Sequence, residues 1–261
     1  MSTGGRLALR TLALGYLLLL LVVPVGMVFY RALEPGLGSV WASVTTPDAQ
    51  HAFWLTCEVV AISVPLNAIF GVAVAWLLVR HRFPGRRLLD VIVDLPFAVS
   101  PVVVGLALIL VWGLDGWLGD LGLSVIFSLP GMVLATIFVS LPFVVREVAP
   151  VLREAGLEQE QAAETLGATS RQTLWRVTLP TIRWGLAYGV ILTTARALGE
   201  YGAVSIVSGK IAGRTETLTL YVEQRFQGFD VAGAYAAAIV LALLAVAVLA
   251  LMTLLHRNRE S

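Results

Sequence analysis

Charged residues are scarce in this sequence of 261 residues, at 13% of the chain, while hydrophobic residues make up 58%. Lysine occurs once, at Lys210, and cysteine once, at Cys57. A single cysteine excludes an intramolecular disulfide. The low charge content excludes an ordinary soluble domain of this length. The net charge of +1 says little about partners.

The sequence also lacks the patterns of common catalytic and metal sites. Its three histidines are widely separated and no metal-ligand spacing is present. The pair Gly209 and Lys210 is followed by Ile211 and has no upstream glycine, so a nucleotide-binding loop is excluded. We therefore expect this chain to bind no cofactor and no metal, to be no enzyme by itself, and to take any energy it needs from another chain.

Long apolar runs predict an all-α integral membrane protein with six transmembrane helices. Arg6 and Arg10 precede the first run. Each run is long enough to cross a bilayer as a helix. The six predicted spans cover residues 11–29, 55–79, 89–112, 129–149, 186–207 and 231–255.

The runs divide the chain into three predicted parts. Residues 1–54 would hold a cytoplasmic tail, the first membrane helix and an external loop from residue 34 to 53. Residues 55–255 would form the core transmembrane domain, and residues 256–261 a cytoplasmic tail. Within the third run, Asp90 and Asp94 are expected to cap a helix N-terminus, where carboxylates are favoured.

Lysine and arginine predict the orientation. With the N-terminus inside, 13 of the 18 basic residues lie on the cytoplasmic side, four lie outside and one, Arg196, lies within a span. Basic residues concentrate on the cytoplasmic side of membrane proteins. Both termini and the polar loop that precedes the fifth run are therefore predicted to be cytoplasmic.

That polar loop reads as two short helices with a corner between them. Residues 159–166 are good helix formers, and Gly167 stands where a left-handed C-terminal cap is wanted. Thr169 and Gln172 match a capping box that starts a second helix. Pro180 should end or bend that helix. The small residues at the corner would let another protein approach the backbone closely.

Two other interpretations compete with a contact to another protein. It can be an ordinary linker between membrane helices. A helix-turn-helix that reads DNA is opposed by its charge, since three arginines are met by glutamates. We therefore expect no nucleic-acid partner.

The loop over residues 157–184 resembles the EAA loop of ABC importer membrane subunits. The motif runs from Gln161 through Gly167 and Val177 to Leu179 and Pro180, with Gln161 replacing Glu and Val177 replacing Ile. The resemblance implies a coupling helix that docks on a cytoplasmic ATPase. The residues implied in this contact are Gln161, Ala162, Ala163, Glu164, Leu166, Gly167, Ala168, Leu179 and Pro180.

Polar residues inside the apolar runs are candidates for a translocation pathway or gate. Arg196 and Glu200 are four positions apart, on one face of a helix over 186–207. Ionisable side chains within a membrane are costly and mark functional sites, although a structural ion pair explains them equally well. The other candidates are Tyr201, Asn67, Ser100, Thr193, Thr194 and Ser205.

Two segments narrow the resemblance to the CysW-type subunits of sulfate/thiosulfate importers: FAVSPVVVGLALIL, and the stretch from VTLP to AVSIVSG. This implies a type I ABC importer permease bundle in a bacterial inner membrane, surrounded by lipid. The implied partners are a sibling CysT/CysU-type permease, a periplasmic sulfate/thiosulfate-binding protein, and two copies of an ATP-binding subunit that uses ATP and Mg. A molybdate or tungstate permease remains the alternative within this class, and a six-span membrane enzyme or scaffold the alternative outside it.

Overall fold

The computed structural model describes residues 3–260, and these residues form helices joined by turns without a β-strand. The predicted all-α class is therefore confirmed. The α-helices are α1 (Thr3–Leu17), α2 (Val23–Leu33), α3 (Leu37–Val44), α4 (Pro47–Arg80), α5 (Arg86–Ala98), α6 (Pro101–Trp112), α7 (Leu129–Glu154), α8 (Glu158–Thr165), α9 (Ser170–Thr173), α10 (Leu179–Leu198), α11 (Gly202–Val207), α12 (Leu218–Gln227) and α13 (Val231–Glu260).

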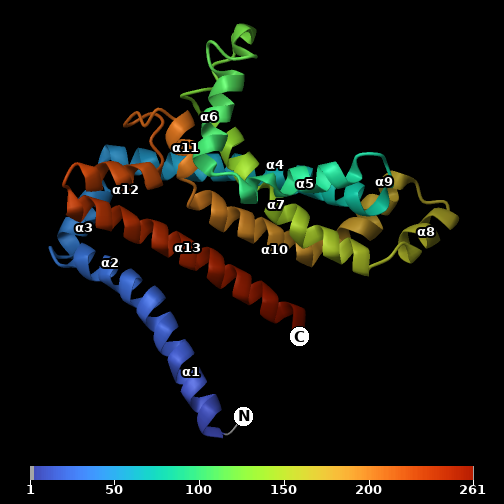
Figure 1. The fold of residues 1–261 in the computed structure, drawn as a ribbon, viewed down its shortest axis with the longest axis horizontal. Helices are drawn as coiled ribbons and strands as arrows, with labels where there is room; N and C mark the ends of the chain where they lie inside the picture. The colour runs from blue at the N-terminus through green and yellow to red at the C-terminus, as the bar shows by residue number, and fades with distance from the viewer. Residues whose placement is uncertain (1–2, 261) are drawn as a thin grey trace.

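The long helices α4, α7, α10 and α13 form an elongated bundle (Figure 1). Helices α8 and α9 lie at one end of this bundle, which we name the inner end. Helices α3 and α12 lie at the opposite end, which we name the outer end. Helix α6 projects sideways from the bundle, and α1 leads away from it (Figure 1). In the most apolar stretch of residues 9–33, no residue is buried against the rest of the chain.

Small residues allow the central helices to pack closely. A Cβ at Gly185 would lie 2.9 Å from the carbonyl oxygen of Glu147, and one at Gly189 would lie 3.0 Å from the Cα of Val144. A Cβ at Gly71 would lie 2.6 Å from the Cβ of the same valine. Glycine therefore brings α4 and α10 against α7, as small residues do between membrane helices.

Four helices in the described part of the chain are long and apolar enough to cross a membrane. Helices α5 and α6 meet at a bend of 114°, and the count of spans rises to five if this pair is taken as one span. The predicted count of six therefore stays a prediction. The four helices cover Leu9–Leu33, Pro47–Arg80, Leu129–Glu154 and Val231–Val248.

The prediction of a continuous third helix over residues 89–112 is wrong, because the chain breaks between Ala98 and Pro101. Pro101 has no N–H to donate and disfavours a helical backbone at the preceding residue. Ser100 accordingly has φ −59° and ψ 133°, outside the helical region. The break separates α5, along the bundle, from the projecting α6.

The expected external loop over residues 34–53 is also largely helical. Helix α3 occupies Leu37–Val44, and α4 begins at Pro47. The hydroxyl of Thr46 accepts a hydrogen bond from the amide of Ala49 at 3.3 Å. A threonine cap followed by proline is a strong helix start, so the second apolar helix begins well before residue 55.

Candidate functional site

The polar loop over residues 157–184 folds as predicted, into two short helices with a corner between them. Gly167 follows α8 with φ +85°. Its amide donates to the carbonyl of Glu164 at 2.9 Å, and the amide of Ala168 donates to that of Ala163 at 3.0 Å. This pair of bonds is a Schellman motif, which requires the left-handed conformation that glycine adopts without strain.

The second half of the corner contains the predicted capping box. The amide of Thr169 donates to Oε1 of Gln172 at 2.8 Å, and the amide of Gln172 donates to the threonine hydroxyl at 3.4 Å. Pro180, however, does not end the helix. A π-helical turn over Leu174–Thr178 leads directly into α10, where Pro180 lies in the first turn. The widened turn accommodates the missing proline donor.

The corner presents a bare surface to its surroundings. A Cβ at Gly167 would meet no atom within 4 Å, and Leu166 is 89% exposed. Gln161, Ala162 and Glu164 are exposed beside them. Of the remaining candidates, Pro180 is exposed, and Ala163, Ala168 and Leu179 are half-buried. An exposed leucine on a backbone free of bulky side chains is suited to contact with another protein.

A buried ion pair behind this corner was missed by the sequence analysis. Arg80, at the end of α4, lies with Nε 3.1 Å from Oε2 of Glu160 in α8. Its Nη2 donates to Oε1 of the same carboxylate at 3.2 Å. Four arginines lie between residues 80 and 87 and look alike in sequence, so only the fold identifies Arg80 as the one paired with Glu160.

A second break, between α10 and α11, changes the interpretation of Arg196 and Glu200. Helix α10 ends at Leu198 and α11 begins at Gly202, so the two residues do not share one helix face. Nη2 of Arg196 nevertheless lies 2.8 Å from Oε2 of Glu200, and the two side chains are paired. The other oxygen of Glu200 accepts the amide of Ala203 at 2.9 Å. The buried carboxylate therefore joins the end of α10 to the start of α11.

The two breaks pack against one another. A Cβ at Gly202 would lie 2.8 Å from the Cβ of Pro101, and a Cβ at Gly105 would lie 2.8 Å from the carbonyl oxygen of Ala203. Ser100 and Tyr201, distant in sequence, therefore lie at adjoining breaks. Irregular backbone at membrane depth occurs where it is buried in protein or lines a wet cavity.

The remaining pathway candidates are divided between the packed interior and this region. Asn67 is buried and donates to Ser140 of α7 at 2.7 Å, so it joins two packed helices. Thr193 is fully buried in α10. Thr194 donates to the carbonyl of Val190 at 2.7 Å within its own helix. These three lie away from the breaks, whereas Ser205 belongs to α11.

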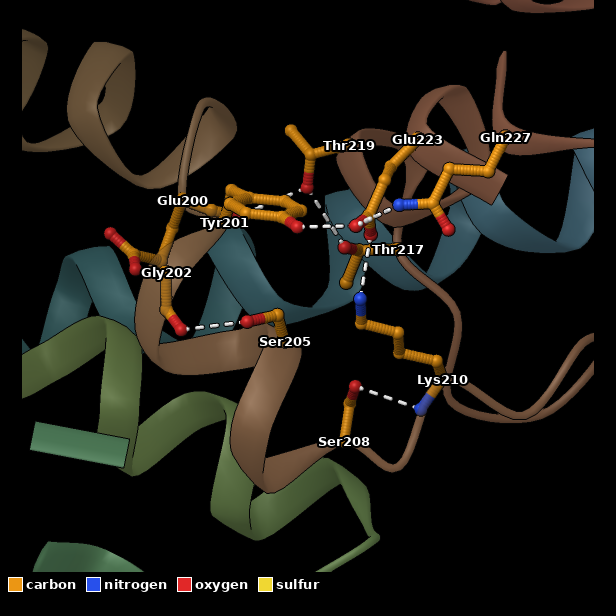
Figure 2. Close-up of polar contacts among 10 residues, drawn as sticks. All are labelled: Glu200, Tyr201, Gly202, Ser205, Ser208, Lys210, Thr217, Thr219, Glu223 and Gln227. Atoms are coloured by element: carbon orange, nitrogen blue, oxygen red, sulfur yellow. Dashed lines mark hydrogen bonds and ion pairs between the residues drawn. The ribbon is translucent and has the colours of Figure 1, made fainter. Parts of the chain in front are cut away.

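Tyr201 belongs to a polar network at the outer end (Figure 2). Its hydroxyl donates to Oε1 of Glu223 at 2.5 Å. Lys210 donates to Oε2 of this carboxylate at 2.7 Å, and Gln227 donates to Oε1 at 2.9 Å. Burial raises the pKa of Glu223, but the hydrogen bonds from Lys210 and Tyr201 outweigh it and lower this pKa below its ordinary value. We name these four residues the outer network.

A second buried carboxyl lies near the outer network. Burial and the nearby charge of Asp48 raise the pKa of Glu216, Arg225 opposes them, and the net pKa is about 6. With its amide nitrogen turned toward this carboxyl, Gln224 donates to Glu216. Glu216 lies in a loop without a recognisable motif, so the sequence contained no signal for it.

The expectation that Asp90 and Asp94 cap a helix is wrong. Helix α5 begins at Arg86, so both carboxylates lie beyond its first turn. They instead pair with Arg146 of α7, which lies 2.9 Å from Oδ1 of Asp90 and 2.6 Å from Oδ2 of Asp94. Among the side chains that the structure describes, no group of three or more His, Cys, Asp or Glu residues is placed to hold a metal ion.

Comparison with solved structures shows the fold. The crystal structure of a bacterial ABC transporter involved in the import of the acidic polysaccharide alginate matches 97% of this chain and 95% of the compared chain, with a TM-score of 0.79 at 18% identity. The alginate transporter in complex with an alginate pentasaccharide-bound periplasmic protein matches 93% of this chain and 90% of the compared chain, with a TM-score of 0.78 at 18% identity.

Sequence comparison finds nearer relatives. The sulfate transport system permease protein CysW of Synechocystis is 52% identical over 96% of this chain and 92% of that protein. CysW of Escherichia coli K12 is 48% identical over 93% of this chain and 84% of its own length. The permease protein CysT of Escherichia coli K12 is 39% identical over 88% of this chain and 86% of its own length.

The profile of the family described as binding-protein-dependent transport system inner membrane component matches residues 67–261. This range contains the inner corner and both helix breaks. The predicted resemblance to ABC importer permeases is confirmed by the profile and by the relatives. The chain belongs to the binding-protein-dependent transport system inner membrane component family, and within it is of the CysW type.

Proposed function

We propose that this chain is a membrane-spanning permease subunit of an ATP-driven importer for sulfate or thiosulfate. The observation that supports this most is the 52% identity to a sulfate permease over nearly the whole chain. The chain forms half of the translocation pathway and couples it to a separate ATPase subunit. Transport of molybdate or tungstate is the alternative, and the uptake experiment below distinguishes it from transport of sulfate.

The exposed corner around Gly167 is the proposed contact with the ATPase. Two copies of that subunit use ATP and Mg, and one of them receives Leu166 and the bare backbone beside it in a groove. A leucine exposed over 89% of its surface is costly in water and gains from burial against a partner. This role requires the corner to be cytoplasmic, and the distribution of arginine and lysine supports the same side for both termini.

A sibling CysT/CysU-type permease is the proposed second half of the pathway. Residues 9–33 form an apolar helix with none of its most apolar stretch buried in this chain, which leaves it free to pack on a neighbour or in lipid. Helix α6 also projects from the bundle with exposed apolar side chains, among them Leu106 and Leu110. A periplasmic binding protein delivers the anion to the outer end.

The joined helix breaks are the proposed gate. A dianion that crosses a low-dielectric bundle needs compensation, yet an isolated cation would hold it too tightly. Arg196 is neutralised by Glu200, and this pair sits where α10 and α11 separate. The pair therefore shapes the pathway instead of forming a strong binding site.

Uptake by a deletion strain tests the proposal. A bacterium that lacks its own CysW-type subunit is supplied with this chain, and uptake of labelled sulfate and labelled molybdate is measured. Restored sulfate uptake that unlabelled molybdate does not suppress supports the proposal. Restored uptake of molybdate alone, or an intact complex that takes up neither anion, overturns it.

A further inference from the structure

Arg80 lies at a junction of three helices. It is the last residue of α4, and its side chain is only 8% exposed. Its Nη1 donates to the carbonyl of Leu152 near the end of α7 at 3.0 Å. Its Nε and Nη2 face the two carboxylate oxygens of Glu160 in α8, at 3.1 and 3.2 Å. A guanidinium holds this geometry because its nitrogens form a rigid planar fork.

Glu160 adds a fourth element to the junction. Its Oε1 also accepts the hydroxyl of Thr178 at 2.9 Å, immediately before α10 begins. The Glu160 side chain is 15% exposed. We name Arg80, Glu160 and Thr178, with the carbonyl of Leu152, the inner joint. One carboxylate thus connects the proposed coupling helix α8 to α4 and α10, and through Arg80 to α7.

A glycine in the left-handed conformation stands on each side of α8. Gly156 precedes the helix with φ +66°, and Gly167 follows it with φ +85°. Within residues 3–260, the hydrogen bonds and ion pairs that join α8 to α4 and to the start of α10 all involve Glu160. Apart from these bonds, α8 packs on α9 and on the π-helical turn that precedes α10, and a left-handed glycine connects it to the chain on each side.

Stability is a poor explanation for such a pair. Removing a guanidinium and a carboxylate from water costs several kcal/mol, and apolar residues of similar size often stabilise a protein as well or better. We infer instead that this largely buried ion pair, with one hydrogen bond between the two side chains, holds α8 in one defined orientation relative to α4. Orientation of α8 relative to the long helices is the property that transmission of motion requires.

We propose that Arg80 and Glu160 are positioning residues that make α8 move as one body with α4, α7 and α10. This inference rests on the proposed role of the corner in coupling. A displacement of α8 by the ATPase then reaches the helix breaks of the bundle. Without the inner joint, α8 turns about Gly156 and Gly167 and the displacement is absorbed in the loop.

The test uses the assembled complex of this chain, its sibling permease and its ATPase, purified and reconstituted in liposomes with the binding protein. The variants are Arg80→Gln, Glu160→Gln, the double variant and Thr178→Val. Arg82→Gln and Glu158→Gln serve as controls, because both side chains are exposed and lie next to the joint in sequence. The readout is the amount of sulfate transported for each ATP hydrolysed.

Each single charge variant is expected to lower the sulfate transported per ATP by about fivefold or more, with ATPase still bound. The double variant should lose no more than the worse single variant, since both changes break the same contact. Thr178→Val should cause a smaller loss of about twofold. The two controls should match the unmodified complex.

An unchanged ratio in the single variants overturns the proposal. Loss of bound ATPase, with a normal ratio in the complexes that remain, also overturns it, because the joint would then serve only assembly. If the single charge variants fail to assemble, Thr178→Val decides, and a normal ratio in that variant overturns the proposal. Failure of the unmodified complex to transport sulfate would instead contradict the proposed function.

Discussion

The two ends of the bundle each hold a carboxylate between a cation and a hydroxyl, in very different surroundings. At the inner joint the side chains of Arg80 and Glu160 are 8% and 15% exposed. In the outer network those of Lys210 and Glu223 are 42% and 21% exposed. A buried guanidinium fork fixes orientation, whereas a more exposed ammonium on a flexible stem is screened by water and salt. This contrast supports the proposed transmission of movement at the inner end and predicts that the outer network rearranges more easily.

The largest effect is expected at Gly167, which tests whether the inner end transmits movement. In Gly167→Leu, the left-handed backbone costs roughly 1–2 kcal/mol and the new side chain occupies the proposed docking surface. Uptake should fall by about tenfold or more, at normal expression. Gly122→Leu is the matched control, since Gly122 also has positive φ and open space around it. Normal uptake and normal stimulation of ATP hydrolysis in Gly167→Leu would remove the corner from the coupling mechanism.

The next effect concerns the region between the two ends. Arg196→Gln and Glu200→Gln should each impair initial sulfate uptake, because each leaves the other charge uncompensated. The double variant should lose less uptake than the two single losses combined. The coupling energy from the double-mutant cycle should be about 1 kcal/mol or more. The measurement is initial uptake corrected for the amount of assembled complex. Strict additivity would show that the pair seen at 2.8 Å has no role as a unit.

A smaller effect is expected from Glu216 at the outer end. Its folded pKa of about 6 lies above the ordinary value of 4.5, so the folded chain binds the proton more tightly than the unfolded chain. Stability should therefore fall as pH rises between these values, by about 2 kcal/mol from this group. The penalty is complete above about pH 6 and absent below about pH 4.5.

Thermal unfolding in detergent measures this dependence. Glu216→Gln should be more stable than the unmodified chain at pH 7.5 and should lose the component that titrates between pH 4.5 and 6. Asp115→Asn is the control, because Asp115 is an exposed carboxylate in the loop that follows α6. An unchanged pH profile in Glu216→Gln would show that the burial of this carboxyl is not maintained in the protein.

The smallest effect should come from Lys210→Gln in the outer network. An ion pair this exposed contributes about 0.5 kcal/mol, and 1 M salt should remove most of that contribution. Urea unfolding at low and high salt, with Arg214→Gln as control, measures the difference. A loss that is large and independent of salt would contradict the contrast drawn between the two ends.

Local sequence patterns predicted the inner corner well because its bonds join residues close in the chain. The cap at Gly167 and the box of Thr169 with Gln172 involve partners at most five residues apart. Proline was less informative. Pro101 stands at the break between α5 and α6. Pro180 instead lies in a continuous helix, because the π-helical turn before it accommodates the missing N–H donor.

The sequence alone therefore determined the all-α membrane class, the position of the two-helix corner around Gly167 and the family resemblance, all of which depend on hydrophobicity, spacing and nearby residues. Only the tertiary structure decided which charges meet. Arg80 and Glu160 are 80 residues apart, and Arg146 and Asp94 are 52 apart. The first pair forms when α8 packs near the end of α4, and the second when α5 packs on α7. Nothing in one segment distinguishes an arginine that will be paired from one that faces water. The meeting of the two helix breaks has the same origin, because the close approach of Gly202 to Pro101 exists only once α6 and α11 lie together.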